Sequence, residues 1–135
     1  MPRICGFHHV SLAATDLDRT ADWYERVFGF EPVLIEEDEE CIRLIVLRHP
    51  DGMLLQLCRP AQLALAVQPS GGAAILSFRV ASQDDLVAWA ERLTGLGVSH
   101  SGPRTAHLGW ALDVIDPSGL HIQLHTYEVI SSDGS

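Results

Sequence analysis

The chain has 135 residues, 47% of them apolar and 20% charged, a balance typical of one globular domain with a hydrophobic core. Its net charge of −9 argues against nucleic-acid binding, which needs a basic surface. No apolar run reaches the ~20 residues of a membrane-spanning helix, and the first residues lack the apolar core of a signal peptide. We therefore expect a cytoplasmic protein with neither nucleic acid nor membrane as a partner.

The first half of the chain predicts a strand, a helix and three more strands. Residues 8–14 are rich in apolar and β-branched side chains, as a strand requires. The helix is expected to have Thr15 or Asp16 as its N-cap and Gly29 in the left-handed conformation at its C-terminal end. The acidic run 36–40 is expected to be a solvated hairpin tip, or else the rim of a cup for a cationic ligand. The three strands are expected at 32–36, 41–48 and 53–59.

The second half predicts the same order of elements. A strand is expected at 74–81, followed by a helix with Ser82 as its N-cap and a left-handed Gly95 at its end. Residues 61–72, which end in Pro69-Ser70-Gly71-Gly72, are expected to link the halves. The last three strands are expected at 98–101, 107–115 and 120–127.

The two halves repeat each other in sequence, which is the strongest signal in the chain. At one fixed offset the first helix matches the second at Trp23/Trp89, Glu25/Glu91, Arg26/Arg92 and Gly29/Gly95. Later in each half the offset grows by a single position, and the last strands match at Pro50/Pro117, Gly52/Gly119, Gln56/Gln123 and Leu57/Leu124. Identities that cluster by segment and keep one offset within it predict a duplicated structural unit.

The three cysteines, Cys5, Cys41 and Cys58, lack CxxC spacing and are odd in number. They therefore predict neither a disulfide framework nor a zinc site. Because each lies in an apolar stretch, we expect buried structural thiols.

Three segments, 8–12, 16–19 and 23–30, together with the Pro-x-Gly turns ahead of Gln56 and Gln123, resemble the vicinal oxygen chelate superfamily. This superfamily includes glyoxalase I, extradiol dioxygenases and the fosfomycin- and bleomycin-resistance proteins. The resemblance implies an α+β fold in which two tandem βαβββ modules form a curved mixed sheet around a cup, with the helices outside. Within a single domain, 1–135, the expected parts are module 5–60, linker 61–72, module 73–128 and a flexible tail 129–135.

The same resemblance implies a divalent metal held by residues on the first and last strands of each module. Those positions fall here on His9, Gln56, Ile75 and Gln123, where the family usually has histidine or glutamine on first strands and glutamate on last strands. Two glutamine amides supply dipoles but no charge, and Ile75 supplies hydrocarbon. A dication left uncompensated in a partly dry site costs several kcal/mol, so no metal cofactor is favoured.

A shifted metal site is the alternative. Residues that alternate along a strand share one face, so His121, Gln123 and His125 point to the same side. A shifted site would combine His9 and Gln123 with His125, or with His121 in its place, and thus offer imidazole and amide ligands to a divalent ion. A metal at the family's positions would instead use His9, Gln56 and Gln123, with His125 as a further ligand.

The same alternation predicts the wall of the cup. Phe7 and Ser11 share the face of His9, whereas His8 is expected to point away from it. Ser77 and Arg79 share the face of Ile75, and Trp110 lies on a strand and is a further candidate. The predicted ligand-binding residues are Phe7, Ser11, Gln56, Ile75, Ser77, Arg79, Trp110, His121, Gln123 and His125. Such a mixture of apolar and convergent polar groups is typical of a small-molecule site.

Two functions compete at this point. The favoured one is a metal-free protein, similar to the bleomycin-resistance branch, that sequesters a small organic molecule. The alternative is an enzyme, an isomerase, lyase or dioxygenase-like protein, that acts on a small oxygenated metabolite through His9 as catalytic base, with or without a divalent metal. In either case the resemblance implies a homodimer.

Overall fold

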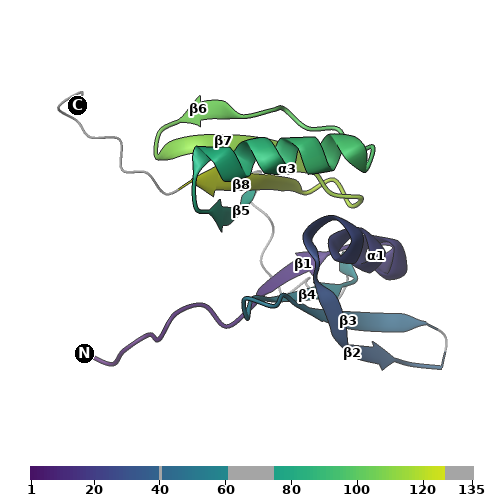
Figure 1. Cartoon of the computed structure of the whole chain (residues 1–135). Helices are drawn as coiled ribbons and strands as arrows, with labels where there is room; N and C mark the ends of the chain where they lie inside the picture. The colour runs from purple at the N-terminus through teal and green to yellow at the C-terminus, as the bar shows by residue number, and fades with distance from the viewer. Residues whose placement is uncertain (40, 61–74, 127–135) are drawn as a thin grey trace. The chain divides into compact units, whose positions relative to one another are not determined.

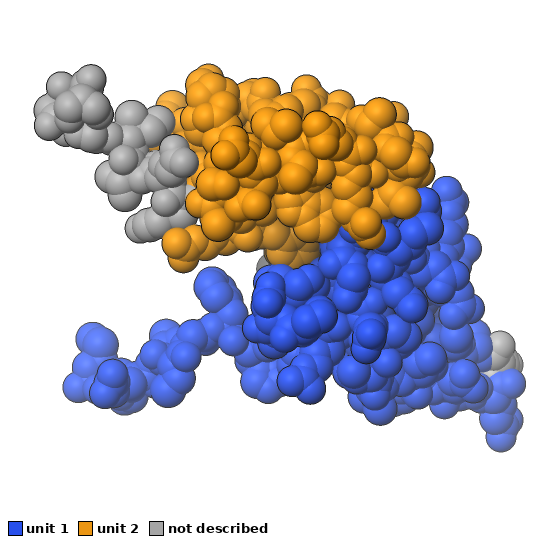
Figure 2. Space-filling view, viewed as in Figure 1, with its two compact units in different colours: residues 1–70 blue, residues 71–135 orange. Residues whose placement is uncertain are grey.

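The computed structural model describes residues 1–39, 41–60 and 75–126. These residues form two compact units, one before and one after the boundary between residues 70 and 71 (Figure 2). The linker expected at 61–72 and the tail expected at 129–135 lie outside the described residues. The module bounds 5–60 and 73–128 therefore stay predictions, as does the cup that would join the modules. Among the helices of the described residues, none is long and apolar enough to cross a membrane.

The first module is a four-stranded mixed sheet with one helix (Figure 1). Its strands lie in the order β1-β4-β3-β2; β1 is parallel to β4 and the other neighbours are antiparallel. In chain order the elements are β1 (Val10–Ala13), α1 (Leu17–Phe28), β2 (Glu31–Glu37), β3 (Ile42–Arg48) and β4 (Leu54–Cys58).

Helix α1 begins and ends where its sequence predicts. The Asp16 side chain accepts a hydrogen bond from the backbone N–H of Arg19 at 3.1 Å, which confirms Asp16 as the N-cap. Gly29 has a φ of 83° and ends the helix in the left-handed conformation. The apolar face of α1 packs on β3 and β4, where Leu47 and Leu57 are fully buried. Burial of this face stabilises the module through the hydrophobic effect.

The second module has the same architecture. Its strands lie in the order β5-β8-β7-β6, with β5 parallel to β8 and the other neighbours antiparallel (Figure 1). The elements are β5 (Ile75–Val80), α3 (Gln83–Gly95), β6 (Arg104–Ala106), β7 (Gly109–Ile115) and β8 (His121–Thr126). Ser82 caps α3, as predicted, by accepting from the backbone N–H of Asp85 at 3.3 Å.

The strand registers of the two modules are equivalent. Ser11 lies opposite Gln56 in the first module, and Ser77 lies opposite Gln123 in the second. The sequence repeat aligns the same residues: Ser11 matches Ser77 at the offset of the helices, and Gln56 matches Gln123 at the offset of the last strands. The prediction of an α+β fold built from two βαβββ modules is confirmed.

The strand predicted at 98–101 was misplaced. Only His100 of that segment forms a bridge, with Val114 of β7, and the regular strand β6 begins later, at Arg104. Gly102 has a φ of 73°, and Pro103 has no N–H to donate. These two residues interrupt the ladder, so the edge of the sheet is divided into a bridge and a short strand.

The expectation that Gly95 ends α3 in the left-handed conformation was also wrong. Gly95 is the last helical residue, Leu96 is the C-cap in the right-handed conformation, and Gly97 takes the positive φ, 73°. The repeat aligns Gly95 with Gly29, but the second helix continues for longer before its chain reverses.

This difference predicts opposite effects of two neighbouring substitutions. Gly97→Ala should lower the free energy of unfolding by about 1–2 kcal/mol, because an L-residue in the left-handed region is strained. Gly95→Ala should raise it by up to about 1 kcal/mol, because alanine favours helix over glycine. A Cβ at either position meets no heavy atom within 4 Å, so the backbone alone decides. Urea denaturation of both variants measures this, and effects of the same sign would contradict the assignment.

The three cysteines differ in burial, contrary to expectation. Cys58 is buried, Cys41 is partly exposed and Cys5 is exposed. Burial raises the pKa of the Cys58 thiol, against a smaller lowering effect of the Gln56 side chain. A buried structural thiol is therefore correct for Cys58 and wrong for Cys5, which lies in the exposed segment ahead of β1.

Candidate functional site

One face of the second sheet is polar, and the other packs on α3. Leu112, Ile122 and Leu124 point toward the helix and are almost fully buried. Alternation along the strands places the intervening residues on the opposite side. We call this side the polar face; it comprises Ile75, Ser77, Arg79, Ala111, Asp113, Ile115, His121, Gln123 and His125, paired across the strands as β5, β8 and β7 align them.

Asp113 lies at the centre of a hydrogen-bond network on the polar face. Its Oδ2 accepts from Arg104 Nε at 2.6 Å, and its Oδ1 accepts from Arg104 Nη2 at 3.2 Å. The same Oδ1 is 2.7 Å from His121 Nε2 and 3.4 Å from Gln123 Nε2. The carboxylate thus faces three donor side chains from the strands on either side of it, one of which carries a full positive charge.

These contacts keep Asp113 ionised. The hydrogen bonds from Arg104 are the main reason why the pKa of the Asp113 carboxyl lies far below its usual range. Desolvation acts in the opposite direction, and the donors on His121 and Gln123 add to the lowering. Since an ionised carboxylate only accepts, the proton in the contact with His121 lies on Nε2 of the imidazole.

Two further contacts orient side chains on β8. The Ser77 hydroxyl donates to Gln123 Oε1 at 2.9 Å, so the amide nitrogen of Gln123 is turned toward Asp113. His125 Nδ1 donates to the backbone carbonyl of Thr126. In the neutral imidazole this leaves Nε2 of His125 as an acceptor.

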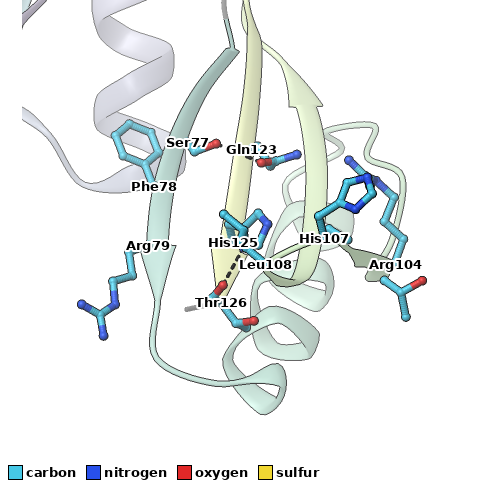
Figure 3. A pocket seen from close by; sticks show the side chains of 11 residues that line it. Ser77, Phe78, Arg79, Arg104, His107, Leu108, Gln123, His125 and Thr126 are labelled. Atoms are coloured by element: carbon cyan, nitrogen blue, oxygen red, sulfur yellow. Dashed lines mark hydrogen bonds between the residues drawn. The ribbon is translucent and has the colours of Figure 1, made fainter. Parts of the chain in front are cut away.

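A pocket of about 950 Å³ opens beside this network, within the second module (Figure 3). Sites for small organic molecules typically measure about 300–1,000 Å³. Figure 3 shows Gln123 and His125 along β8, with Ser77 on one side and His107 and Arg104 on the other, while Arg79 extends outward from β5. The pocket is lined by Ser77, Phe78 and Arg79 of β5, by residues 104–108 of the β6–β7 hairpin, and by Gln123, His125 and Thr126 of β8.

The structure places four of the predicted ligand-binding residues at this pocket: Ser77, Arg79, Gln123 and His125. His121 belongs to the adjoining network instead, through Asp113. Ile75 lies opposite His121 at the start of β5 and is half exposed. Trp110 alternates with Leu112 on the side of α3, so it lies on the opposite face from His125 and does not line the pocket.

The predicted site residues of the first module lie in two places. Ser11 and Gln56 are neighbours on β1 and β4 and are partly buried. His9 and Phe7 precede β1 in an exposed segment. The expectation that His8 points away from His9 was wrong, because their Nδ1 atoms are 2.8 Å apart. The alternation rule fails for these residues because the regular strand begins only at Val10.

The donor set at the four inherited metal positions does not fit a divalent ion. It contains the exposed imidazole of His9, the amides of Gln56 and Gln123, and the hydrocarbon side chain of Ile75. Asp113 is the carboxylate beside Gln123, but Arg104 already compensates its charge. Across residues 1–39, 41–60 and 75–126, no group of three or more His, Cys, Asp or Glu side chains is arranged to hold a metal ion.

Sequence reasoning missed Asp113 and Arg104, although the repeat contained a signal for Asp113. At the offset that aligns Gln56 with Gln123, the counterparts of Asp113, His121 and His125 in the first module are Val46, Leu54 and Cys58. The structure supports this alignment, since Val46 lies opposite Gln56 as Asp113 lies opposite Gln123. The second copy thus has polar side chains at three positions where the first copy has apolar ones. Such a difference between the copies of a repeat indicates which copy carries a polar site.

The chain belongs to the glyoxalase/bleomycin resistance protein/dioxygenase superfamily, whose family model matches residues 6–124. This is the family that the segments 8–12, 16–19 and 23–30 resemble. A comparison with curated protein sequences gave no significant match.

Several solved structures share the fold. A lactoylglutathione lyase from Agrobacterium tumefaciens is 20% identical, with a TM-score of 0.74 over 93% of this chain and 96% of its own. TnmS3, an antibiotic-binding protein from Streptomyces sp. CB03234, is 20% identical, with a TM-score of 0.69 over 93% of this chain and 100% of its own. TioX from Micromonospora sp. ML1 is 27% identical, with a TM-score of 0.70 over 90% of this chain and 99% of its own. Both an enzyme and a binding protein therefore use this fold, so the residues of the site must decide between them.

Proposed function

We propose that this protein binds a small organic molecule at the pocket of the second module and does so without a metal ion. The observation that carries the proposal is the pairing of Asp113 with Arg104 beside a pocket of about 950 Å³. A guanidinium already compensates the carboxylate nearest to Gln123, so a dication there would have to displace it. The convergent polar groups Ser77, Gln123 and His125 offer hydrogen bonds to an organic ligand instead.

Filling the pocket tests its role in binding. Ala106 lines the pocket from β6, and Ala88 is exposed on α3 of the same module. Small organic fragments that bind the original chain are first found in a ligand-detected NMR screen with EDTA present. Their affinity should fall about tenfold or more in Ala106→Trp, which corresponds to about 1.4 kcal/mol of binding free energy. Ala88→Trp introduces the same side chain away from the pocket and should leave binding unchanged. Fragments that bind equally to both variants would place the site elsewhere.

Metal content tests the second part of the proposal. Protein purified without a chelator should contain divalent metal far below one ion per chain, and EDTA should leave fragment binding intact. The double variant Ile75→His with Gln123→Glu should bind Mn²⁺ more tightly than the original chain, because it introduces an imidazole and a carboxylate. Stoichiometric metal that is lost in His9→Ala would contradict metal-free binding.

An enzyme acting on a small oxygenated metabolite is the second candidate function, and one observation favours it. His121 donates a hydrogen bond from Nε2 to the ionised Asp113 at 2.7 Å. In the neutral imidazole this leaves Nδ1 as the basic nitrogen. A histidine oriented in this way is suited to general base catalysis. Metal-free turnover that is lost in His121→Gln would support this candidate, whereas turnover lost in His9→Gln would return the role to His9.

We further propose that the protein is cytoplasmic and forms a homodimer. The homodimer rests on the family resemblance and on β2, whose Val33, Leu34 and Ile35 are about half exposed within the first module. Sedimentation as a clean monomer at micromolar concentration would count against it.

A further inference from the structure

In the described part of the second module, the side chains that line the pocket include basic ones but no acidic ones. Of the residues between 75 and 126 that line it, two are arginines and two are histidines, and none is Asp or Glu. The whole chain has the opposite balance, with 18 acidic and 9 basic residues. A lining that presents guanidinium groups favours small anions over cations.

Arg104 is the best-oriented cation in this lining. Its Nε and Nη2 donate to the two oxygens of Asp113 at 2.6 and 3.2 Å, which fixes the plane of the guanidinium. A guanidinium has five N–H donors, so a second edge is available beyond these two bonds. The Arg104 side chain is 45% exposed and lines the pocket, so a ligand in the pocket can approach this side chain. The planar fork of arginine matches the two oxygens of a carboxylate.

Hydrocarbon lies next to these charges. Ala106 and Leu108 of the β6–β7 hairpin line the same pocket, and the Leu108 side chain is exposed. A ligand with an apolar group beside its anionic group would contact both kinds of surface.

We propose that this pocket binds an organic carboxylate, with Arg104 as the group that binds the carboxylate and Asp113 as the residue that positions Arg104. This inference rests on the proposed function and names the class of its ligand. A cationic ligand is disfavoured because the Asp113 carboxylate already accepts hydrogen bonds from Arg104, His121 and Gln123. Such a ligand would have to displace Arg104 to reach the carboxylate.

Three probes of the same shape and different charge test the inference: benzoate, benzamide and benzamidine. Their binding is followed by the NMR signals of the His107 and His125 rings, which lie in the pocket. Benzoate should bind about tenfold more tightly than benzamide, because charge-assisted hydrogen bonds are about twice as strong as neutral ones. Benzamidine should give no saturable shift.

Substitution of Arg104 should remove this preference. In Arg104→Gln the affinity for benzoate should fall to that for benzamide, and benzamidine should gain affinity because Asp113 has lost its cation. Arg19→Gln makes the same change of charge on the exposed side of α1 and should keep the preference. Arg104→Lys retains a positive charge beside Asp113 but not the planar fork, so benzoate affinity should fall severalfold.

The outcomes separate this inference from the proposed function. Benzamide that binds the pocket as tightly as benzoate would overturn the carboxylate assignment and leave a small-molecule site. A preference for benzoate that survives in both Arg104→Gln and Arg104→Lys would overturn the role of Arg104. If none of the three probes shifts His107 or His125, the pocket itself is contradicted as a binding site.

Discussion

Replacing Trp23 with alanine should lower the free energy of unfolding by about 3–5 kcal/mol, whereas Trp89→Ala should cost only about 1 kcal/mol. The two residues occupy equivalent positions of the repeat, but their surroundings differ. Trp23 is 7% exposed and packs edge-on against Tyr24 and Phe28, with ring centroids 5.0 and 5.4 Å apart. Trp89 is only partly buried, and the guanidinium of Arg92 lies over its ring at 5.9 Å.

Equilibrium urea unfolding of the two variants, followed by far-UV circular dichroism, measures this difference. The expected result is a much lower midpoint for Trp23→Ala than for Trp89→Ala. Equal costs would show that the second helix is buried as deeply as the first, which would contradict the structure of the second module.

Replacing Asp113 with asparagine should lower the free energy of unfolding by about 2 kcal/mol at pH 7, because hydrogen bonds to a charged group contribute about 1.5–3 kcal/mol. The substitution keeps the shape of the side chain but removes the charge that holds Arg104, His121 and Gln123. As a control, Asp38→Asn should cost about 0.5 kcal/mol or less. Asp38 pairs with Arg43 at 3.8 Å, and both side chains are about half exposed.

The effect of Asp113→Asn should also depend on pH. The folded state lowers the pKa of Asp113 from its ordinary value of 3.8, so the unfolded chain takes up this proton first as the pH falls. The stability contributed by the carboxylate is therefore complete above the ordinary pKa and decreases below it. Wild type and Asp113→Asn should differ most at neutral pH and progressively less below about pH 4. A difference that stays constant through that range would contradict the ionised network.

Local signals in the sequence predicted most of the fold. The N-caps Asp16 and Ser82 and the left-handed Gly29 depend on a few adjacent residues, and all three are confirmed. The repeat and the family resemblance supported the βαβββ succession of elements along each half of the chain. The last edge strand was misplaced because its position depends on a neighbouring strand: Gly102 and Pro103 interrupt the pairing of this segment with β7. The periodicity of one segment carries no information on its partner.

The candidate site was harder to predict for the same reason. Ser77, Gln123 and His125 follow from alternation along single strands, and the structure places them at one pocket. The pairing of Arg104 with Asp113 joins two strands and requires their register, which the sequence pattern left open. Trp110 lies on the side of β7 that faces α3, and the sequence pattern did not tell which face of that strand the helix would cover. His9 lies ahead of a strand that begins later than expected, at Val10.

Val46 and Asp113 occupy the same place in the two modules but differ in chemistry. When a half is duplicated, each copy retains a helix and a sheet that fold by the same packing. One copy is then free to accumulate charged side chains on its open surface while the other keeps its aliphatic ones. If the proposed pocket is the binding site, substitutions in the second module alone can change which ligand it accepts.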